Sequence, residues 1–288
     1  MDVIIIGLLL GGTYALMAMG LQLQYGVARI MNLANGEMLI AGAFGAFWFY
    51  AGTQTSPLLA LLFVVPLAFV LNWAIYRVLI LPLARRAKSQ GKLEVDSILA
   101  TFGLSFIFIG IMVAVFGAQY TDYAYLSEPV FIFGERYGLN RVVAFLCSVV
   151  LCVGLYIWLH KTRAGLALRA ISVNPSAAGL VSINVARASA LAFALGGAVT
   201  AAGGVLLSMY LTFDASYGVV FTLKALIIVI LGGVGDIRGT ILAAFILGLA
   251  ETAVATLVDP GLTLASAYVL FMIVLLVRPE GLFGRRTA

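Results

Sequence analysis

The chain has 288 residues, of which 63% are hydrophobic and only 10% are charged, and its mean hydropathy is +1.12. A soluble domain carries about 25% charged residues, so this composition excludes a soluble protein and indicates an integral membrane protein. The formal net charge is +5, but the basic residues lie in connectors between apolar runs, which argues for membrane orientation and against nucleic acid as a partner.

Apolar segments follow one another along the whole chain, and a helix needs about 20 apolar residues to cross a bilayer. In chain order the candidate spans are 3–23, 34–51, 57–80, 97–117, 141–159, 188–211, 219–231, 239–257 and 264–277. Segment 219–231 is short and contains Lys224. A tilted helix, a broken helix and a re-entrant segment are all consistent with it. We expect one all-α, polytopic membrane domain over residues 1–288, with about 8 transmembrane helices and some broken or re-entrant segments.

The charges in the connectors predict the orientation of the chain. Basic residues dominate three connectors, which we expect in the cytoplasm by the positive-inside rule: 77–94, 160–187 and 278–288. Acidic residues dominate three others, which we expect outside: 118–140, 212–218 and 258–263. The N-terminus is then outside and the C-terminus inside. The start, "MDVIIIGLLLGG", lacks the basic region of a signal peptide, so we interpret it as the beginning of the first span.

Three ionisable residues lie inside apolar segments: Glu37, Lys224 and Glu251. Charged groups at membrane depth are costly, and each is therefore a functional-site hypothesis. Asn35 is a candidate helix N-cap, so Glu37 either complements the helix dipole near the inner surface or has a gating or coupling role. Lys224 either extends toward the outer surface or pairs with Glu251, which we expect to be buried and paired.

Polar residues on the first helix are candidates for a transport path. Thr13 and Gln24 are eleven residues apart, about three helical turns, so one face of the helix is able to line a pore. The same side chains also serve as interhelical hydrogen bonds, which is the favoured interpretation for each residue taken singly. The complete set of translocation-pathway candidates is Thr13, Tyr14, Asn35, Glu37, Lys224 and Glu251.

Several kinds of chemistry lack their motifs in this sequence. The run 225–245 partly imitates a dinucleotide fingerprint, but Arg238 occupies the third glycine position, and a tight inner turn explains the glycines better. No phosphate-binding loop, no Cys/His metal spacing and no HExxH motif occur in the sequence. We interpret Cys147 and Cys152 as packing thiols. A proton- or sodium-coupled pump is disfavoured because no buried charge cluster is present, which favours a partner as the source of energy for transport.

Segment 169–187 is the least hydrophobic long stretch in the second half of the chain. Asn174 is a good N-cap and Pro175 suits the first helical position. The sequence therefore predicts a short helix on the cytoplasmic surface that starts at Pro175 and exposes small side chains to an approaching protein. A weak echo also links "LGGTYALMAMG" (10–20) with "LGGAVTAAGGV" (195–205), which indicates either an inverted repeat or simple close packing of small residues.

The stretch "LALRAISVNPSAAGLVSINVAR" resembles the cytoplasmic coupling segment of permease subunits in branched-chain amino acid ABC importers, the Liv type. Three further motifs occur in the family's order: residues 7–38, residues 221–251 and "VRPEGLFG" at 277–284. The resemblance covers nearly the whole chain, and the chain length is similar to that of the first of the family's two permease types. At Asp236-Ile237-Arg238 the chain departs from the family's glycine turn, where serine and a non-basic residue are more usual. This difference bears on the packing of the turn or on the intracellular gate.

The resemblance implies partners and a division of labour. It implies a second, related permease subunit, two cytoplasmic ATPases that bind ATP and Mg, and a periplasmic solute-binding protein, all at the bacterial inner membrane and in contact with its lipid. It implies that this chain has no cofactor of its own and is not an enzyme. The implied ATPase-coupling residues within segment 160–187 are Arg169, Asn174, Pro175, Ser176, Ala177, Ala178 and Asn184.

The substrate and the mode of transport stay open at the level of sequence. Close relatives in the resembled family carry branched-chain amino acids, urea, short amides or other small solutes. A self-sufficient channel or secondary carrier is an alternative, and an intramembrane enzyme is disfavoured because the apolar spans hold no paired serine and histidine and no pair of aspartates.

Overall fold

The computed structural model of the protein describes residues 2–87, 89–132, 134–278 and 281–283, and only the backbone of Gln90, Ile132 and Ser176. Some charged residues of the basic connectors, namely Lys88, Glu280, Arg285 and Arg286, lie outside the described residues.

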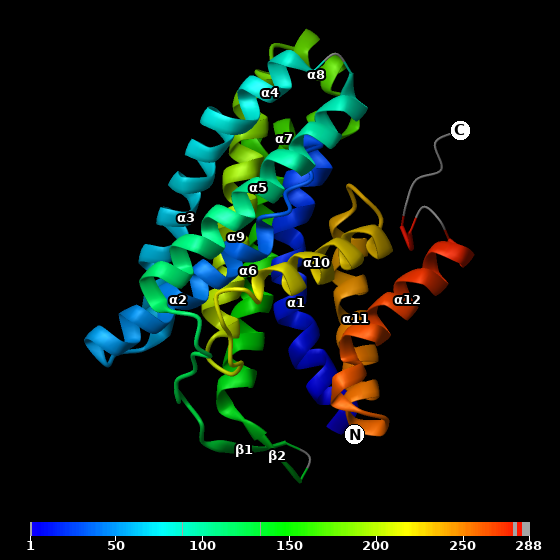
Figure 1. Ribbon diagram of the computed structural model, residues 1–288. Helices are drawn as coiled ribbons and strands as arrows, with labels where there is room; N and C mark the ends of the chain where they lie inside the picture. Colours follow the sequence, from blue (N-terminus) through cyan, green and yellow to red (C-terminus); the bar gives the residue numbers. More distant parts are fainter. Residues whose placement is uncertain (1, 88, 133, 279–280, 284–288) are drawn as a thin grey trace.

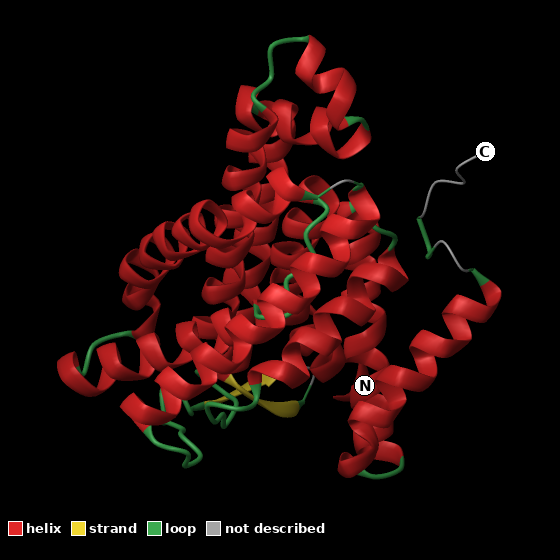
Figure 2. Ribbon diagram, turned by 45° about the horizontal axis from the view of Figure 1, so that its top comes forward, coloured by secondary structure: helices red, strands yellow, loops and turns green. Residues whose placement is uncertain are grey.

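The described chain is almost entirely helical, as the sequence predicts (Figure 2). The first helices are α1 (Asp2–Ala28), α2 (Asn35–Thr53), η1 (Pro57–Ala60), α3 (Leu61–Ile75), the π-helical turn η2 (Tyr76–Ile80), α4 (Leu81–Arg86) and α5 (Gln90–Phe116). An antiparallel hairpin of β1 (Pro129–Ile132) and β2 (Glu135–Gly138) follows, with Val130 opposite Tyr137. The later helices are α6 (Leu139–Lys161), α7 (Arg163–Val173), α8 (Pro175–Leu180), α9 (Val185–Leu207), α10 (Gly218–Gly232), α11 (Ile237–Leu257), η3 (Pro260–Leu262) and α12 (Thr263–Val277).

Seven helical segments of the described residues are long and apolar enough to span a membrane. They are Asp2–Ala28, Pro57–Arg86, Gly91–Phe116, Leu139–Lys161, Val185–Leu207, Ile237–Leu257 and Pro260–Val277. Helix α10 is a shorter apolar helix. The chain is therefore a multi-pass membrane protein. Helices α3, α5 and α12 bury little of their surface and expose large apolar residues such as Leu67 and Leu276, which is the surface that lipid solvates.

Helix α1 forms the centre of the molecule and packs most extensively against α9 and α11 (Figure 1). Glycines allow the close approach: a Cβ on Gly20 would collide with Thr200 and Gly196 of α9, and Gly7 faces the backbone of Leu249 in α11. Without a hydrophobic force between helices in lipid, such small-residue contacts provide the packing.

The backbone between α1 and α2 leaves the helix at residues 29–34 although it is buried in the protein. Non-helical backbone at membrane depth is tolerated where protein groups satisfy it. Asn32 Oδ1 accepts from the N–H of Ala34, Thr101 Oγ1 accepts from the N–H of Leu33, and Thr222 Oγ1 accepts from the N–H of Gly36. Polar side chains from several parts of the chain therefore stabilise the non-helical backbone of this break.

A second break, at residues 208–217, separates α9 from the short helix α10. Asn140 of α6 donates to the carbonyl of Met209, and Thr121 of the outer loop forms a two-way backbone bridge with Phe213. The order helix, break, helix thus occurs twice, in α1–α2 and in α9–α10. Helices α1 and α9 run antiparallel, because Gln24 reaches Phe193 while Gly20 lies against Gly196.

The two ends of the molecule differ in their elements (Figure 1). The N-terminus and the β1–β2 hairpin lie at one end, where the Tyr137 hydroxyl donates to Asp2 Oδ1 at 2.8 Å. Helices α4, α7 and α8 lie at the other end. The acidic connector 118–140 and the basic connectors 77–94 and 160–187 therefore lie at opposite ends.

Candidate functional site

A cavity of about 410 Å³ lies between α1, α10, α11 and the chain that follows α9. Its size falls within the range of about 300–1,000 Å³ that is usual for small-molecule sites. Apolar residues such as Leu10, Leu207 and Phe221 form much of the wall. The polar lining comprises Tyr14, Arg141, Tyr210, Tyr217, Lys224, Glu251, Thr252, Thr256 and Thr263.

Tyr14, Lys224 and Glu251 form a compact polar group in the cavity wall. Lys224 Nζ lies 2.8 Å from Glu251 Oε2 and 2.7 Å from the Tyr14 hydroxyl, which itself donates to Glu251 Oε2 at 2.8 Å. Glu251 is only 2% exposed, and its second oxygen, Oε1, has no hydrogen-bond partner among the described residues. Of the two alternatives for Lys224, the ion pair with Glu251 is the one that forms. Glu251 is buried and paired as expected.

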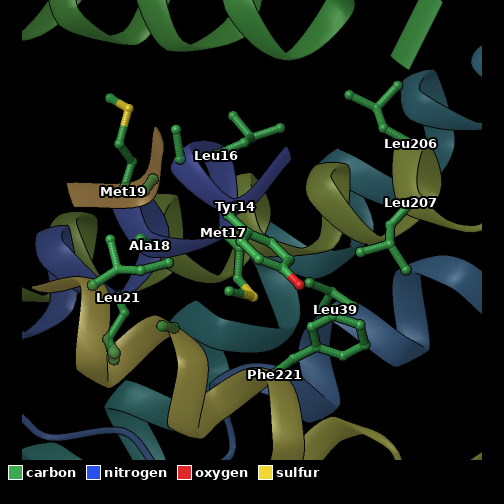
Figure 3. Packing of buried hydrophobic residues seen from close by; sticks show 14 of the residues in the cluster. Tyr14, Leu16, Met17, Ala18, Met19, Leu21, Leu39, Leu206, Leu207 and Phe221 are labelled. Carbon is green, nitrogen blue, oxygen red and sulfur yellow. The ribbon is translucent and has the colours of Figure 1, made fainter. Parts of the chain in front are cut away.

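The structure explains why three distant positions meet at this point. Tyr14 lies in the middle of α1, and its ring packs in the main hydrophobic cluster with Met17 and Phe221 (Figure 3). Helices α10 and α11 are consecutive, and the glycine turn between them folds Lys224 back toward Glu251. An ion pair in an apolar region is stable when both charges are matched and hydrogen-bonded, and Tyr14 adds a contact to each partner.

Glu37 lies in a different environment, between the first turns of α2 and α10. It is fully buried, it occupies the first turn of α2, and its carboxylate rests on Gly218 at the first residue of α10. Neither carboxylate oxygen has a hydrogen-bond partner among the described residues. The structure does not bring Glu37 together with Lys224 and Glu251 in the cavity.

Asn35 does not cap α2, contrary to the sequence prediction. The helix begins at Asn35 itself, and Ala34 occupies the cap position without a side-chain bond. The Asn35 side chain instead accepts from the hydroxyl of Thr200 at 3.0 Å. Thr222 of α10 satisfies the N–H of Gly36 in its place, so a contact between helices replaces the local cap.

The polar face predicted on α1 does not form a continuous lining. Thr13 bonds to the hydroxyl of Tyr210 at 2.7 Å, whereas Gln24 bonds to the carbonyl of Phe193 and to Asn32. Both Thr13 and Gln24 are buried within this chain. Of this helix face, Tyr14 contacts the cavity, and the other polar residues serve as bonds between segments.

Segment 160–187 has the predicted helix and a surface that the sequence did not predict. Asn174 Oδ1 accepts from the N–H of Ala177 at 3.0 Å, and Pro175 occupies the first turn of α8. Ala177 is exposed, but Ala178 is buried against its neighbours, which corrects the prediction that the small residues of α8 are all exposed. The exposed large apolar residues of the segment include Leu180 (89%), Val173 (73%) and Val181 (69%). Leu180 and Val181 belong to "AGLVSIN", where the sequence prediction considered only the small residues.

The other predicted coupling residues have mainly internal contacts. Arg169 is half-buried and donates back to the carbonyl of His160 at 3.4 Å. Asn184 caps α9 by accepting from the N–H of Arg187, so it ends the segment. The side chain of Ser176 lies outside the described residues.

The turn between α10 and α11 is the tight glycine turn that the sequence indicates. Gly233 and Gly235 have positive φ angles of 100° and 91°, and Asp236 caps α11. Arg238 donates to the Tyr156 hydroxyl of α6 from Nε at 3.0 Å and from a terminal nitrogen at 2.7 Å. The unusual Asp-Ile-Arg sequence therefore adds a cap and a link between α11 and α6.

Outside the membrane-spanning segments, Tyr123 connects the outer loop to the second break. Its hydroxyl bonds to Ser208 at 2.8 Å. Burial raises the pKa of Tyr123 to about 12, so the hydroxyl stays protonated at neutral pH and the contact is insensitive to pH there.

Comparison with known families resolves what kind of membrane protein has this arrangement. The family model described as "Branched-chain amino acid transport system / permease component" matches residues 3–278. The chain belongs to this permease family. The matched range includes the residues that line the cavity, helices α2 and α10, and segment 160–187.

Individual permeases of known systems are similar to this chain over three quarters or more of their length. The "High-affinity branched-chain amino acid transport system permease protein LivH" of Escherichia coli (strain K12) is 29% identical, with 97% of this chain and 94% of the relative covered. The corresponding protein BraD of Pseudomonas aeruginosa is 30% identical with the same coverage. A "Probable branched-chain amino acid transport permease protein LivH" of Methanocaldococcus jannaschii is 28% identical over 82% of this chain and 75% of its own.

Proposed function

We propose that this chain is a permease subunit of an ATP-binding-cassette importer that carries branched-chain amino acids across the bacterial inner membrane. Its membership of the permease family supports a transport role, and the printed names of its relatives support the substrate class. In this proposal a second, related permease subunit completes the pathway, and a periplasmic binding protein delivers the substrate to the end that holds the β1–β2 hairpin.

The observation that carries the proposal is the surface of the coupling segment. Leu180 and Val181 are among the most exposed apolar residues of the chain, and they lie at the end rich in basic connectors. A contiguous exposed apolar patch rimmed by polar residues marks a contact with another protein or with the membrane. In our proposal a cytoplasmic ATPase binds this surface, and ATP and Mg act in that ATPase and not in this chain.

Helix α8 is short and capped, and it contacts the rest of the chain in a way that suits the transfer of force. Asn174 fixes the start of α8, and α7 packs against α6 and α9 as well as α8. A movement imposed on α8 is then passed to long helices that contact α1. In our proposal the N-terminus is outside and the C-terminus cytoplasmic.

The test is to purify this chain with its candidate ATPases and to measure ATP hydrolysis that depends on the loaded binding protein. Leu180→Asp is expected to abolish the stimulation, because it places a charge in an apolar contact while removing no packing within this chain. Leu180→Met is the matched control and is expected to keep the stimulation. Co-purification without an ATPase, or full stimulation in the Leu180→Asp assembly, would contradict the proposed role.

A further inference from the structure

The polar group in the cavity wall has hydrogen-bonding capacity that the chain itself does not use. Glu251 Oε2 receives both the Tyr14 hydroxyl and Lys224 Nζ, whereas Oε1 has no partner among the described residues. A lysine ammonium has three N–H donors, and Lys224 directs two of them to Tyr14 and Glu251. One acceptor and one donor are therefore available side by side.

An acceptor and a donor without hydrogen-bond partners cost free energy in an apolar environment. A buried carboxylate oxygen without a partner forfeits its hydration and gains nothing in return. Ionisable residues at membrane depth occur mainly along substrate pathways. The cavity of about 410 Å³ is lined by both residues, so a ligand in the cavity lies next to the pair, whose Oε1 is itself buried.

The two available groups have a defined complement. Oε1 of an ionised glutamate accepts from a cationic N–H group, and the remaining N–H of Lys224 donates to an anionic oxygen. A molecule with an ammonium and a carboxylate on the same carbon satisfies both groups at once. Such a zwitterion is neutral overall, so its binding leaves the charge balance of the Lys224–Glu251 pair unchanged.

The remaining cavity wall suits an aliphatic side chain. Leu10, Leu207 and Phe221 line it with apolar surface. Arg141 is exposed and also lines the cavity, with its guanidinium over the Tyr210 ring at 5.9 Å, and its charge attracts a carboxylate.

We propose that this cavity is a subsite within the permease for the main-chain ammonium and carboxylate of an aliphatic α-amino acid, held by Glu251 Oε1 and Lys224 Nζ. This assignment rests on the proposed function for its substrate class. Tyr14 is a positioning residue, because it fixes Glu251 Oε2 and leaves Oε1 toward the ligand. The apolar wall selects an aliphatic side chain.

The experiment measures equilibrium binding of radiolabelled L-leucine to the complete assembly in nanodiscs, without the binding protein. Competition by L-leucinamide, which lacks the carboxylate, and by isocaproate, which lacks the ammonium, reports each end of the ligand separately. We expect Glu251→Gln and Lys224→Met each to weaken leucine binding about tenfold or more. Glu251→Gln is also expected to reduce the preference for leucine over isocaproate, and Lys224→Met the preference for leucine over leucinamide.

These shifts in preference separate ligand contact from a purely structural pair. A structural pair changes the amount of folded assembly but not the rank order of the three ligands. The double variant Lys224→Gln/Glu251→Gln removes both charges together and avoids a lone buried charge; it is expected to fold and to lose the discrimination entirely. Glu135→Gln and Lys92→Met, at exposed positions, are the matched controls and are expected to bind as the unmodified chain does.

Unchanged leucine affinity and unchanged rank order in Glu251→Gln, Lys224→Met and the double variant would overturn the subsite. Absence of saturable leucine binding to the unmodified assembly would overturn it as well. ATP-dependent leucine uptake by the same assembly tests the proposed function separately, so uptake without an effect of these variants overturns only the subsite.

Discussion

At the scale of single residues, the Lys224–Glu251 pair is the contact whose loss has the most direct consequence. Glu251 is buried, Lys224 is nearly so, and each is bonded to the other and to Tyr14. Removing one partner leaves the other charge uncompensated, which costs about 3–5 kcal/mol, whereas replacing both with apolar residues is often neutral.

We therefore expect Lys224→Met to lower the thermal midpoint of the detergent-purified chain markedly and Lys224→Met/Glu251→Met to regain most of that loss. Thermal unfolding followed by intrinsic fluorescence measures both variants. Lys92→Met, on an exposed lysine, is the control and is expected to have little effect. Equal destabilisation by the single and double variants would show that the pairing of the charges is not what matters.

Single residues also show where prediction from sequence succeeds. Asn174 was predicted as a cap because both the donor and the acceptor lie within four residues of chain, and local chemistry decides such contacts. Asn35 was predicted in the same way and wrongly, because Thr200, 165 positions away, offers its side chain a partner. For Lys224 the sequence left two alternatives, extension toward the outer surface or a pair with Glu251. The sequence does not decide between them, because the outcome depends on how α10 and α11 pack together.

At the scale of elements, glycine contacts decide how closely α1 approaches its neighbours. Gly20 in α1 and Gly103 in α5 are both interior to long helices, but a Cβ on Gly20 would meet α9, whereas a Cβ on Gly103 would have no atom within 4 Å. The two positions therefore separate packing from helix propensity within one protein.

We expect Gly20→Ala to destabilise the chain by about 1–3 kcal/mol through overpacking. Gly103→Ala is expected to be neutral or to stabilise it by about 1 kcal/mol, because alanine has the higher helix propensity. Unfolding in a denaturing detergent series measures both free energies. A stabilising effect of Gly20→Ala would contradict the close α1–α9 contact.

Helices were the most predictable elements, because long apolar runs report them directly. Segments 219–231 and 264–277 agree with α10 and α12 to within one residue at each end. The hairpin β1–β2 was not predicted, because the outer connector has no alternating pattern that separates it from a loop. The π-helical turn Tyr76–Ile80 was also missed; it precedes Pro82, which has no N–H to donate and displaces the preceding turn.

At the scale of the whole molecule, the charge of the connectors predicts the orientation in the membrane. In a background with Cys147→Ala and Cys152→Ala, we expect Tyr120→Cys to react with a membrane-impermeant maleimide in intact cells. Leu180→Cys is expected to react only after permeabilisation. Both positions are highly exposed, so access to the reagent decides the result, and the reverse pattern would invert the orientation.

Our proposal makes transport by the whole chain dependent on partners, and this is its central claim. The measurement that tests it most directly is uptake of radiolabelled L-leucine into proteoliposomes, with this chain alone and with the complete assembly of permeases, ATPases and binding protein. We predict uptake by the complete assembly with ATP and Mg, and none without ATP or with this chain alone. ATP-independent uptake by this chain alone would contradict the account and establish a self-sufficient channel or carrier.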